Sequence, residues 1–175
     1  HVVAVEIDEM AAGQACENVR QSQWRDSIEV VCSDITKYTP DEVKFDIIVC
    51  NPPFFRDSLR SPNAVRSQAR HNDSLSYEKL ADTVLRLLAN DGTFNLVLPF
   101  DMADTFTLIA ARRGLYMSKH TKVVTRQGVA PKRVLLSFVK QQIVHVEEDE
   151  LVMFDSNNAE TLDYISLVKD FYLKY

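Results

Sequence analysis

The sequence predicts a single α/β domain, residues 1–175, built around a mostly parallel, doubly wound sheet. Three short apolar runs at 2–7, 28–32 and 45–50 are rich in β-branched residues, which is typical of buried strands. Segments whose apolar residues recur at helical spacing alternate with these runs, as in strand–helix–strand units. A chain of this length with 46% hydrophobic residues can bury one sizeable core, and no linker or repeat divides it.

The first predicted helix follows the first strand directly. That strand ends in acids, and Asp8 is placed to cap a helix over residues 9–22. Within this range four apolar residues recur at helical spacing and give the helix one apolar face: Ala12, Ala15, Cys16 and Val19. The strands at 28–32 and 45–50 come next along the chain.

A second helix is expected after residue 75. Ser76 can cap it, and Leu80 and Leu88 share its apolar face. The tripeptide Asn90-Asp91-Gly92 is typical of a helix end, so we expect the helix to stop there. The run that follows, 93–99, is predicted to be a strand.

The last third of the chain is predicted to add one helix and an antiparallel pair of strands. Asp101 can cap that helix, and Gly114 closes it. Residues 115–125 and 133–140 have strand-like composition and are separated by a turn, so we expect an antiparallel hairpin at the edge of the sheet. Two elements complete the prediction, a short strand at 151–154 and a final helix beginning near Leu162.

The tetrapeptide Asn51-Pro52-Pro53-Phe54 stands directly after the third strand. Proline lacks the backbone N–H that a sheet ladder needs, so the strand stops there and the turn is stiff. The carboxyl edge of an open α/β sheet is where ligands bind. There the Asn51 side-chain oxygen and the Pro52 carbonyl can accept hydrogen bonds from an exocyclic NH2, and Phe54 can stack on a heterocycle. These four are the candidate catalytic residues; a strand-ending turn with a buried Phe is the structural alternative.

Two further strand ends carry acids. Glu6 can accept hydrogen bonds from the two hydroxyls of a ribose. Asp34 can accept one from an adenine amino group, while the Ile35 backbone N–H meets a ring nitrogen. The simpler interpretations are an exposed strand end for Glu6 and a turn for Asp34. Three strand ends in succession favour a nucleoside-cofactor site, although this geometry serves S-adenosylmethionine and NAD equally.

A basic segment follows the tetrapeptide. It holds a single acid, Asp57, against four arginines: Arg56, Arg60, Arg66 and Arg70. Because the whole chain has a formal net charge of −5, this local excess of positive charge predicts a patch that binds the phosphates of a nucleic acid. Lys132 and Arg133, with Arg126, can extend the patch from the predicted hairpin. The alternative is a solvated loop.

Composition argues against several other classes of protein. No apolar run approaches the ~20 residues that span a bilayer, and nothing resembles a signal peptide, so we expect no membrane contact. The three cysteines form no Cys-x-x-Cys pair, so neither a disulfide framework nor a metal site is expected, and a reducing cytoplasm is the simplest setting. The sequence does not indicate an oligomeric state.

With these features in place, the chain resembles the bacterial tRNA1(Val) adenine-37 N6-methyltransferases, a family of class I S-adenosylmethionine-dependent methyltransferases. The similarity extends over essentially all 175 residues. It is densest in five stretches: Val5-Glu6-Ile7-Asp8, residues 51–54, Gln68-Ala69-Arg70, residues 131–136 and Phe171-Tyr172-Leu173. The resemblance implies a Rossmann-like sheet of seven strands with one strand antiparallel and helices on both faces.

The resemblance also implies an activity and its residues. S-adenosylmethionine would be bound by Glu6, Ile7, Asp34, Ile35 and Asn51. The target adenine, in tRNA, would be held by residues 51–54 while its exocyclic amine takes the methyl group directly, in line. The alternatives are methylation of guanine N2 in rRNA, methylation of a protein glutamine, or a non-catalytic RNA-binding derivative. The family's first strand and Gly-rich loop would precede His1, so we expect an N-terminally incomplete methyltransferase domain.

Overall fold

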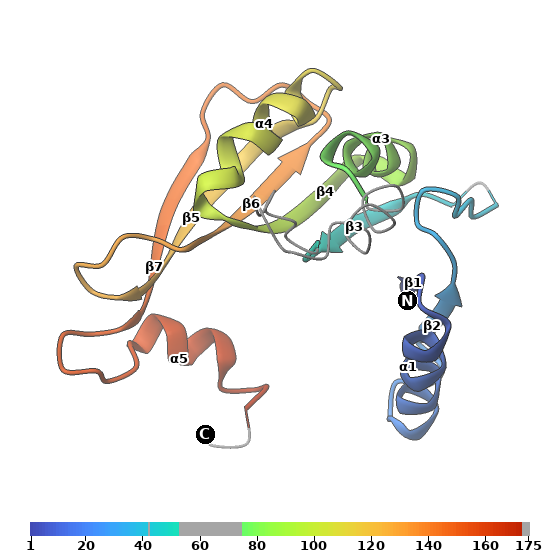
Figure 1. Ribbon diagram of the computed structural model, residues 1–175, viewed down its shortest axis with the longest axis horizontal. Coiled ribbons are helices and arrows are strands. Elements are labelled where there is room, and N and C mark those ends of the chain that lie inside the picture. The colour runs from blue at the N-terminus through green and yellow to red at the C-terminus, as the bar shows by residue number, and fades with distance from the viewer. Residues whose placement is uncertain (42, 53–74, 173–175) are drawn as a thin grey trace, which may run out of the picture. The chain divides into compact units, whose positions relative to one another are not determined.

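The computed structural model describes residues 1–41, 43–52 and 75–172 (Figure 1). The chain divides into two compact units, His1–Val43 and Lys44–Tyr175, and each is described by itself. One domain over residues 1–175 stays a prediction.

Unit 1 is a strand–helix–strand unit. Its elements are β1 (Val2–Glu6), α1 (Glu9–Gln21) and β2 (Ile28–Cys32). The two strands pair in parallel, which brings Glu6 opposite Cys32. Asp8 caps α1 as predicted, because its carboxylate accepts a hydrogen bond of 2.8 Å from the Ala11 N–H. The predicted strand–helix–strand order of this part is confirmed.

Unit 2 is built on a five-stranded sheet in the order β3-β4-β6-β5-β7. Its elements are β3 (Phe45–Cys50), α3 (Tyr77–Leu87), β4 (Leu88–Pro99), the 3-10 helix η1 (Phe100–Met102), α4 (Ala103–Ala111), β5 (Tyr116–Arg126), β6 (Arg133–Val139), β7 (Glu147–Phe154) and α5 (Leu162–Val168). β3 runs parallel to β4, and β6 runs antiparallel to both β4 and β5. The expected antiparallel hairpin is present, and β7 pairs in parallel with β5 and lies outside it.

Helices α3 and α4 cover the same face of this sheet (Figure 1). Three fully buried aromatic rings lie between the layers, Phe94 from β4, Phe106 from α4 and Phe138 from β6. Their centroids are 5.3–6.2 Å apart, the spacing that aromatic pairs prefer. The cluster fixes β4 against β6, and β3 is hydrogen-bonded to β4, so the end of β3 rests on a well-packed support.

The predicted boundary between α3 and β4 is wrong. α3 starts at its Ser76 cap as expected but ends at Leu87, and Leu88 is already paired with Phe45 of β3. The tripeptide 90–92 therefore lies inside β4, where β4 advances five residues, Leu88 to Thr93, while β3 advances two, Phe45 to Ile47. This tripeptide is typical of a helix end, but in the structure it forms an irregularity within β4. Pairing with β3 outweighs its local preference for a helix end.

The predicted cap of α4 is also wrong. Asp101 lies inside η1, and no side chain caps α4 by a hydrogen bond. Gly114 closes the helix as expected, with a φ of 93° that favours glycine.

Candidate active site

The carboxyl ends of β1 and β2 form one candidate edge, within unit 1. Glu6 lies opposite Cys32, and the Ser33 N–H donates a 2.9 Å hydrogen bond to the Glu6 carbonyl. The structure therefore brings Glu6 and Asp34 to the same edge of this small sheet, as the sequence predicted.

Glu6 has the features of a ligand-binding carboxylate. One of its oxygens, Oε1, accepts a 2.9 Å hydrogen bond from the Asp8 N–H, which orients the half-buried side chain. Its other oxygen has no hydrogen-bond partner among the described residues. Ile7, the next residue, is 63% exposed. This arrangement fits a ribose, whose hydroxyls need acceptors at fixed positions.

Asp34 closes a turn at the end of β2. Its Oδ1 accepts hydrogen bonds from the Thr36 N–H at 2.9 Å and the Thr36 hydroxyl at 2.7 Å, and Lys37 Nζ lies 3.9 Å from Oδ2. This is the turn role that the sequence left open as the simpler interpretation. Its contact with an adenine, and that of the half-buried Ile35, stay predictions.

Asn51 and Pro52 mark a second edge, in unit 2. Cys50, the last residue of β3, lies opposite Leu96 of β4, so Asn51 leaves the sheet beside a buried strand. Asn51 is exposed, and its carboxamide makes no hydrogen bond to any other described residue. Pro52 is buried. The edge thus presents a carboxamide whose hydrogen-bonding groups are available to a ligand.

The rest of the predicted segment lies outside the described residues. This holds for the other two residues of the tetrapeptide, Pro53 and Phe54, and for the four arginines Arg56, Arg60, Arg66 and Arg70. Their roles stay predictions.

The thiol next to Asn51 is kept neutral. Burial raises the pKa of Cys50 to about 11, because a thiolate would lose its hydration there. At neutral pH the site therefore has no thiolate at this position that could compete as a nucleophile with a bound amine.

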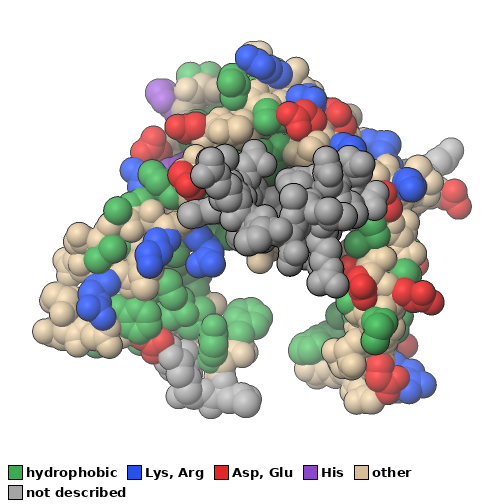
Figure 2. All heavy atoms as spheres, in the orientation of Figure 1, with side chains coloured by type: hydrophobic (Ala, Val, Ile, Leu, Met, Phe, Trp, Pro, Cys, Tyr) green, Lys and Arg blue, Asp and Glu red, His purple; other side chains and the backbone are tan. Residues whose placement is uncertain are grey.

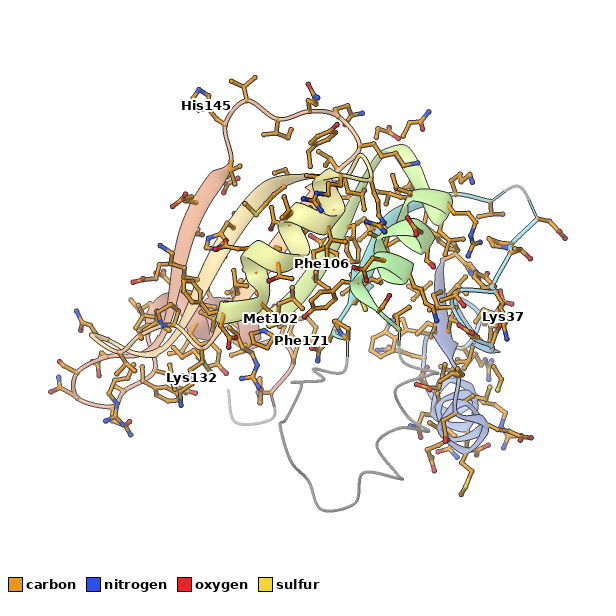
Figure 3. All side chains as sticks on the ribbon, turned by 45° about the horizontal axis from the view of Figure 1, so that its top comes forward. Lys37, Met102, Phe106, Lys132, His145 and Phe171 are labelled. Carbon is orange, nitrogen blue, oxygen red and sulfur yellow. The ribbon has the colours of Figure 1, made fainter. Side chains whose placement is uncertain are left out.

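The sheet order brings two predicted cations to the Asn51 edge of unit 2. Pro99, the end of β4, lies opposite Arg133, and the Phe100 N–H donates a 3.1 Å hydrogen bond to the Lys132 carbonyl. Because β3 and β4 are parallel, these residues are at the end of the sheet where Asn51 leaves β3. Figure 3 shows Lys132 and Met102 at this end and His145 at the other.

Both cations are available for binding. Lys132 and Arg133 are exposed and form no ion pair with a described acid. Arg126, at the end of β5, donates a hydrogen bond to the Asn158 side chain in the turn before α5. In Figure 2, Lys and Arg side chains stand together over this end of the sheet. The structure therefore places two exposed cations at the Asn51 end of the sheet, within unit 2.

Two aromatic residues at this edge were missed by the sequence analysis. Phe100 follows Pro99 at the end of β4 and is 38% exposed, and its ring meets that of His120 at a centroid distance of 6.4 Å. A signal was present, because Pro99-Phe100 repeats the sequence pattern of Pro53-Phe54, an aromatic residue directly after a proline.

The described residues contain neither a metal-binding cluster nor a membrane-spanning helix. No group of three or more His, Cys, Asp or Glu side chains among them could hold a metal ion. None of the helices in the described part of the chain has the length and apolar character needed to cross a membrane.

Comparison with known proteins identifies the family. The family model for the methyltransferase small domain matches residues 1–98. A Bacteroides fragilis protein named tRNA1(Val) (adenine(37)-N6)-methyltransferase is 46% identical over 99% of this chain and 73% of its own length. This chain belongs to that family. Other members with the same name are those of Bacteroides thetaiotaomicron, 46% identical, and Haemophilus influenzae, 39% identical, each over 99% of this chain and 72–73% of its own length.

Solved structures confirm the predicted class I methyltransferase fold for this family member. An Agrobacterium tumefaciens protein described as a predicted O-methyltransferase has a TM-score of 0.69 at 18% identity, over 95% of this chain and 76% of its own. A Listeria monocytogenes protein described as a putative class I S-adenosylmethionine-dependent methyltransferase has a TM-score of 0.59 at 12% identity, over 86% of this chain and 49% of its own. At these identities the similarity shows the fold alone.

Proposed function

We propose that this protein transfers a methyl group from S-adenosylmethionine to N6 of adenine 37 in tRNA1(Val). Family membership supports the reaction and the substrate. The structural observation that carries the proposal is the exposed carboxamide of Asn51, which directly follows β3 and has no hydrogen-bond partner among the described residues.

The described residues of unit 1 fit a nucleoside cofactor. Glu6 keeps one carboxylate oxygen for a ribose hydroxyl while the other is fixed by the Asp8 N–H. We assign Ile7 to the same site, Asp34 and Ile35 to the adenine, and Asn51 to the end of the cofactor that meets the substrate. S-adenosylmethionine, when bound, supplies an electrophilic methyl group on a sulfonium sulfur.

In this proposal Asn51 and Pro52 bind the exocyclic amine of the adenine. Their two oxygens accept the two N6 protons, which aims the nitrogen lone pair, and Phe54 stacks on the adenine ring. The cofactor would supply its methyl group to N6 and leave as a thioether, and one N6 proton would be released to water. No protein base is needed, so the enzyme contributes position and preorganised charge.

The cations provide the RNA contact in this proposal. We assign phosphate binding to Lys132 and Arg133 at the end of the unit 2 sheet, and to Arg56, Arg60, Arg66 and Arg70 after the tetrapeptide. From a tRNA substrate we infer a cytoplasmic location.

The test uses the full-length protein with radiolabelled S-adenosylmethionine and unmodified tRNA, followed by digestion of the RNA to nucleosides. Label in N6-methyladenosine at position 37 is expected. Asn51→Ala should lower kcat by on the order of 10²-fold, because one oriented hydrogen-bonding group of the transition state is lost, while cofactor affinity measured by calorimetry is retained.

Asn157→Ala is the matched control, since Asn157 is also an exposed asparagine but lies in the turn after β7. It should turn over like the wild type. Equal turnover by Asn51→Ala would refute the role of that residue, and label in protein instead of RNA would replace the proposed substrate.

A further inference from the structure

Phe100 is an exposed aromatic residue that lies opposite Lys132, the residue before β6. Its backbone N–H is hydrogen-bonded to the carbonyl of Lys132, and the residue before it, Pro99, pairs with Arg133. The side chain is 38% exposed and directly follows a strand whose alternate apolar residues are deeply buried, with Leu96 at 2% and Leu98 at 0%. An apolar ring is thus presented to solvent opposite an exposed lysine.

The Phe100 ring is supported from one side. The imidazole of His120, on β5, meets it at 6.4 Å between centroids and 66° between planes, an edge-on contact. His120 Nδ1 is buried and has no hydrogen-bond partner in the described part of the chain, so the imidazole contributes packing here. A ring that is held from behind and open in front can take a second flat partner on its exposed side.

The sheet register gives the position of Phe100 relative to Asn51. Cys50 lies opposite Leu96, so Asn51 is level with Val97, and Phe100 follows three residues later. At about 3.3 Å per strand residue, Phe100 lies about 10 Å farther out along the strand direction. The sideways spacing between β3 and β4 is only about 4.8 Å, which is smaller than this displacement along the strands. Phe100 therefore lies mainly beyond Asn51 in the direction in which the strands leave the sheet.

We propose that Phe100 stacks on the nucleotide next to the target adenine, with Lys132 and Arg133 binding the phosphates beside it. The inference rests on the proposed function. An adenine whose amine is to be methylated must leave its stack, which leaves its neighbour without one stacking partner. Phe100 replaces that partner. Aromatic faces interleaved with cations are the usual means of binding unstacked RNA.

The experiment measures tRNA affinity, turnover and base stacking with the full-length protein. Phe100→Leu should weaken tRNA binding by about tenfold, within the range found when stacking residues are removed, while kcat at saturating tRNA is retained. Phe100→Trp should restore affinity, since a larger aromatic face is kept. The matched control is Trp24→Leu: Trp24 is 57% exposed in the turn before β2, at the end of that strand away from Asp34, and its loss should change neither quantity.

A tRNA with 2-aminopurine beside the target adenine reports the stacking directly. Its fluorescence should be quenched by the wild type and by Phe100→Trp, and not by Phe100→Leu. Wild-type tRNA affinity and wild-type quenching in Phe100→Leu would overturn the proposal. A fall in kcat with unchanged affinity would also overturn it, because the ring would then contact the target base and not its neighbour. If Phe100→Leu has a lowered melting temperature, the affinity of Phe100→Trp and the fluorescence of the probe decide whether the proposal holds. If the wild type quenches the probe but methylates no RNA, the proposed function fails while the role of Phe100 stands.

Discussion

Replacing Gly92 by Ala tests how β3 is held against β4. A Cβ at this buried position would lie 2.8 Å from Cδ1 of Leu88, 2.9 Å from the Phe45 carbonyl oxygen and 3.0 Å from the Asp46 carbonyl oxygen. Two of these neighbours are backbone atoms of β3, and the Leu88 side chain is itself fully buried. None of them can move aside freely, so the strands must separate locally.

The expected cost follows from these contacts. Overpacking of a closed site costs about 1–3 kcal/mol, and the smaller entropy of unfolded alanine offsets about 0.4–1 kcal/mol of it. We therefore expect the free energy of unfolding to fall by about 1–2 kcal/mol, which lowers the melting temperature by about 2–8 °C for a protein of this size. Asn51 follows β3, so methyl transfer should fall as well.

Equilibrium unfolding in urea and thermal melting of the full-length protein measure the change. Gly13→Ala is the control, because Gly13 lies in the interior of α1 and a Cβ there meets nothing within 4 Å. It should be stabilising by about 0.5–1 kcal/mol. A Gly92→Ala protein as stable as the wild type would refute the argument that β3 and β4 are in contact at this point.

Three further predictions follow from the Asn51 edge of unit 2. Lys132→Gln and Arg133→Gln should each reduce the slope of log affinity for tRNA against log salt by about one, whereas Lys119→Gln, whose ammonium is already paired with acids of β7, should leave it unchanged; equal slopes in all three would contradict phosphate binding. The rate of Cys50 alkylation, measured by mass spectrometry, should still rise about tenfold per pH unit above pH 9, because burial raises the pKa of this thiol to about 11. A rate that levels off near pH 9 would show a thiol with an ordinary pKa. His120→Phe should raise the free energy of unfolding by about 1 kcal/mol, since Nδ1 is buried without a partner among the described residues, and a loss of stability in urea would reveal a hydrogen bond there.

The sequence predicted best where one local signal decides the structure. Asp8 and Ser76 are caps because a short polar side chain before an apolar helical pattern has few other uses, and both accept the expected hydrogen bonds. The acids at the ends of β1 and β2 come together for a similar reason, since parallel strands share one carboxyl edge.

Prediction failed where a distant partner decides. Asn90-Asp91-Gly92 looks like a helix end, but the carbonyls of Phe45 and Asp46 lie against Gly92, and that contact cannot be seen in the local sequence. The exposure of Phe100 is a different case, because the strand end at Pro99 was predicted correctly and a local signal, an aromatic residue directly after a proline, was present.

The distribution of buried side chains has a consequence for local opening. Among the described residues, Ala12 is the one apolar residue of unit 1 that is buried, whereas unit 2 contains the aromatic cluster and the other buried residues. Regions with few buried apolar contacts unfold locally at low free energy, so amide hydrogens of β1 and β2 should exchange with solvent deuterium well before those of β4 and β6. A ligand held by Glu6 and Asp34 would bind unit 1 only while β1 and β2 are folded. Its binding free energy would therefore stabilise the folded form and slow hydrogen exchange in these strands. Cofactor affinity and the rigidity of β1 and β2 would then be two measures of one equilibrium.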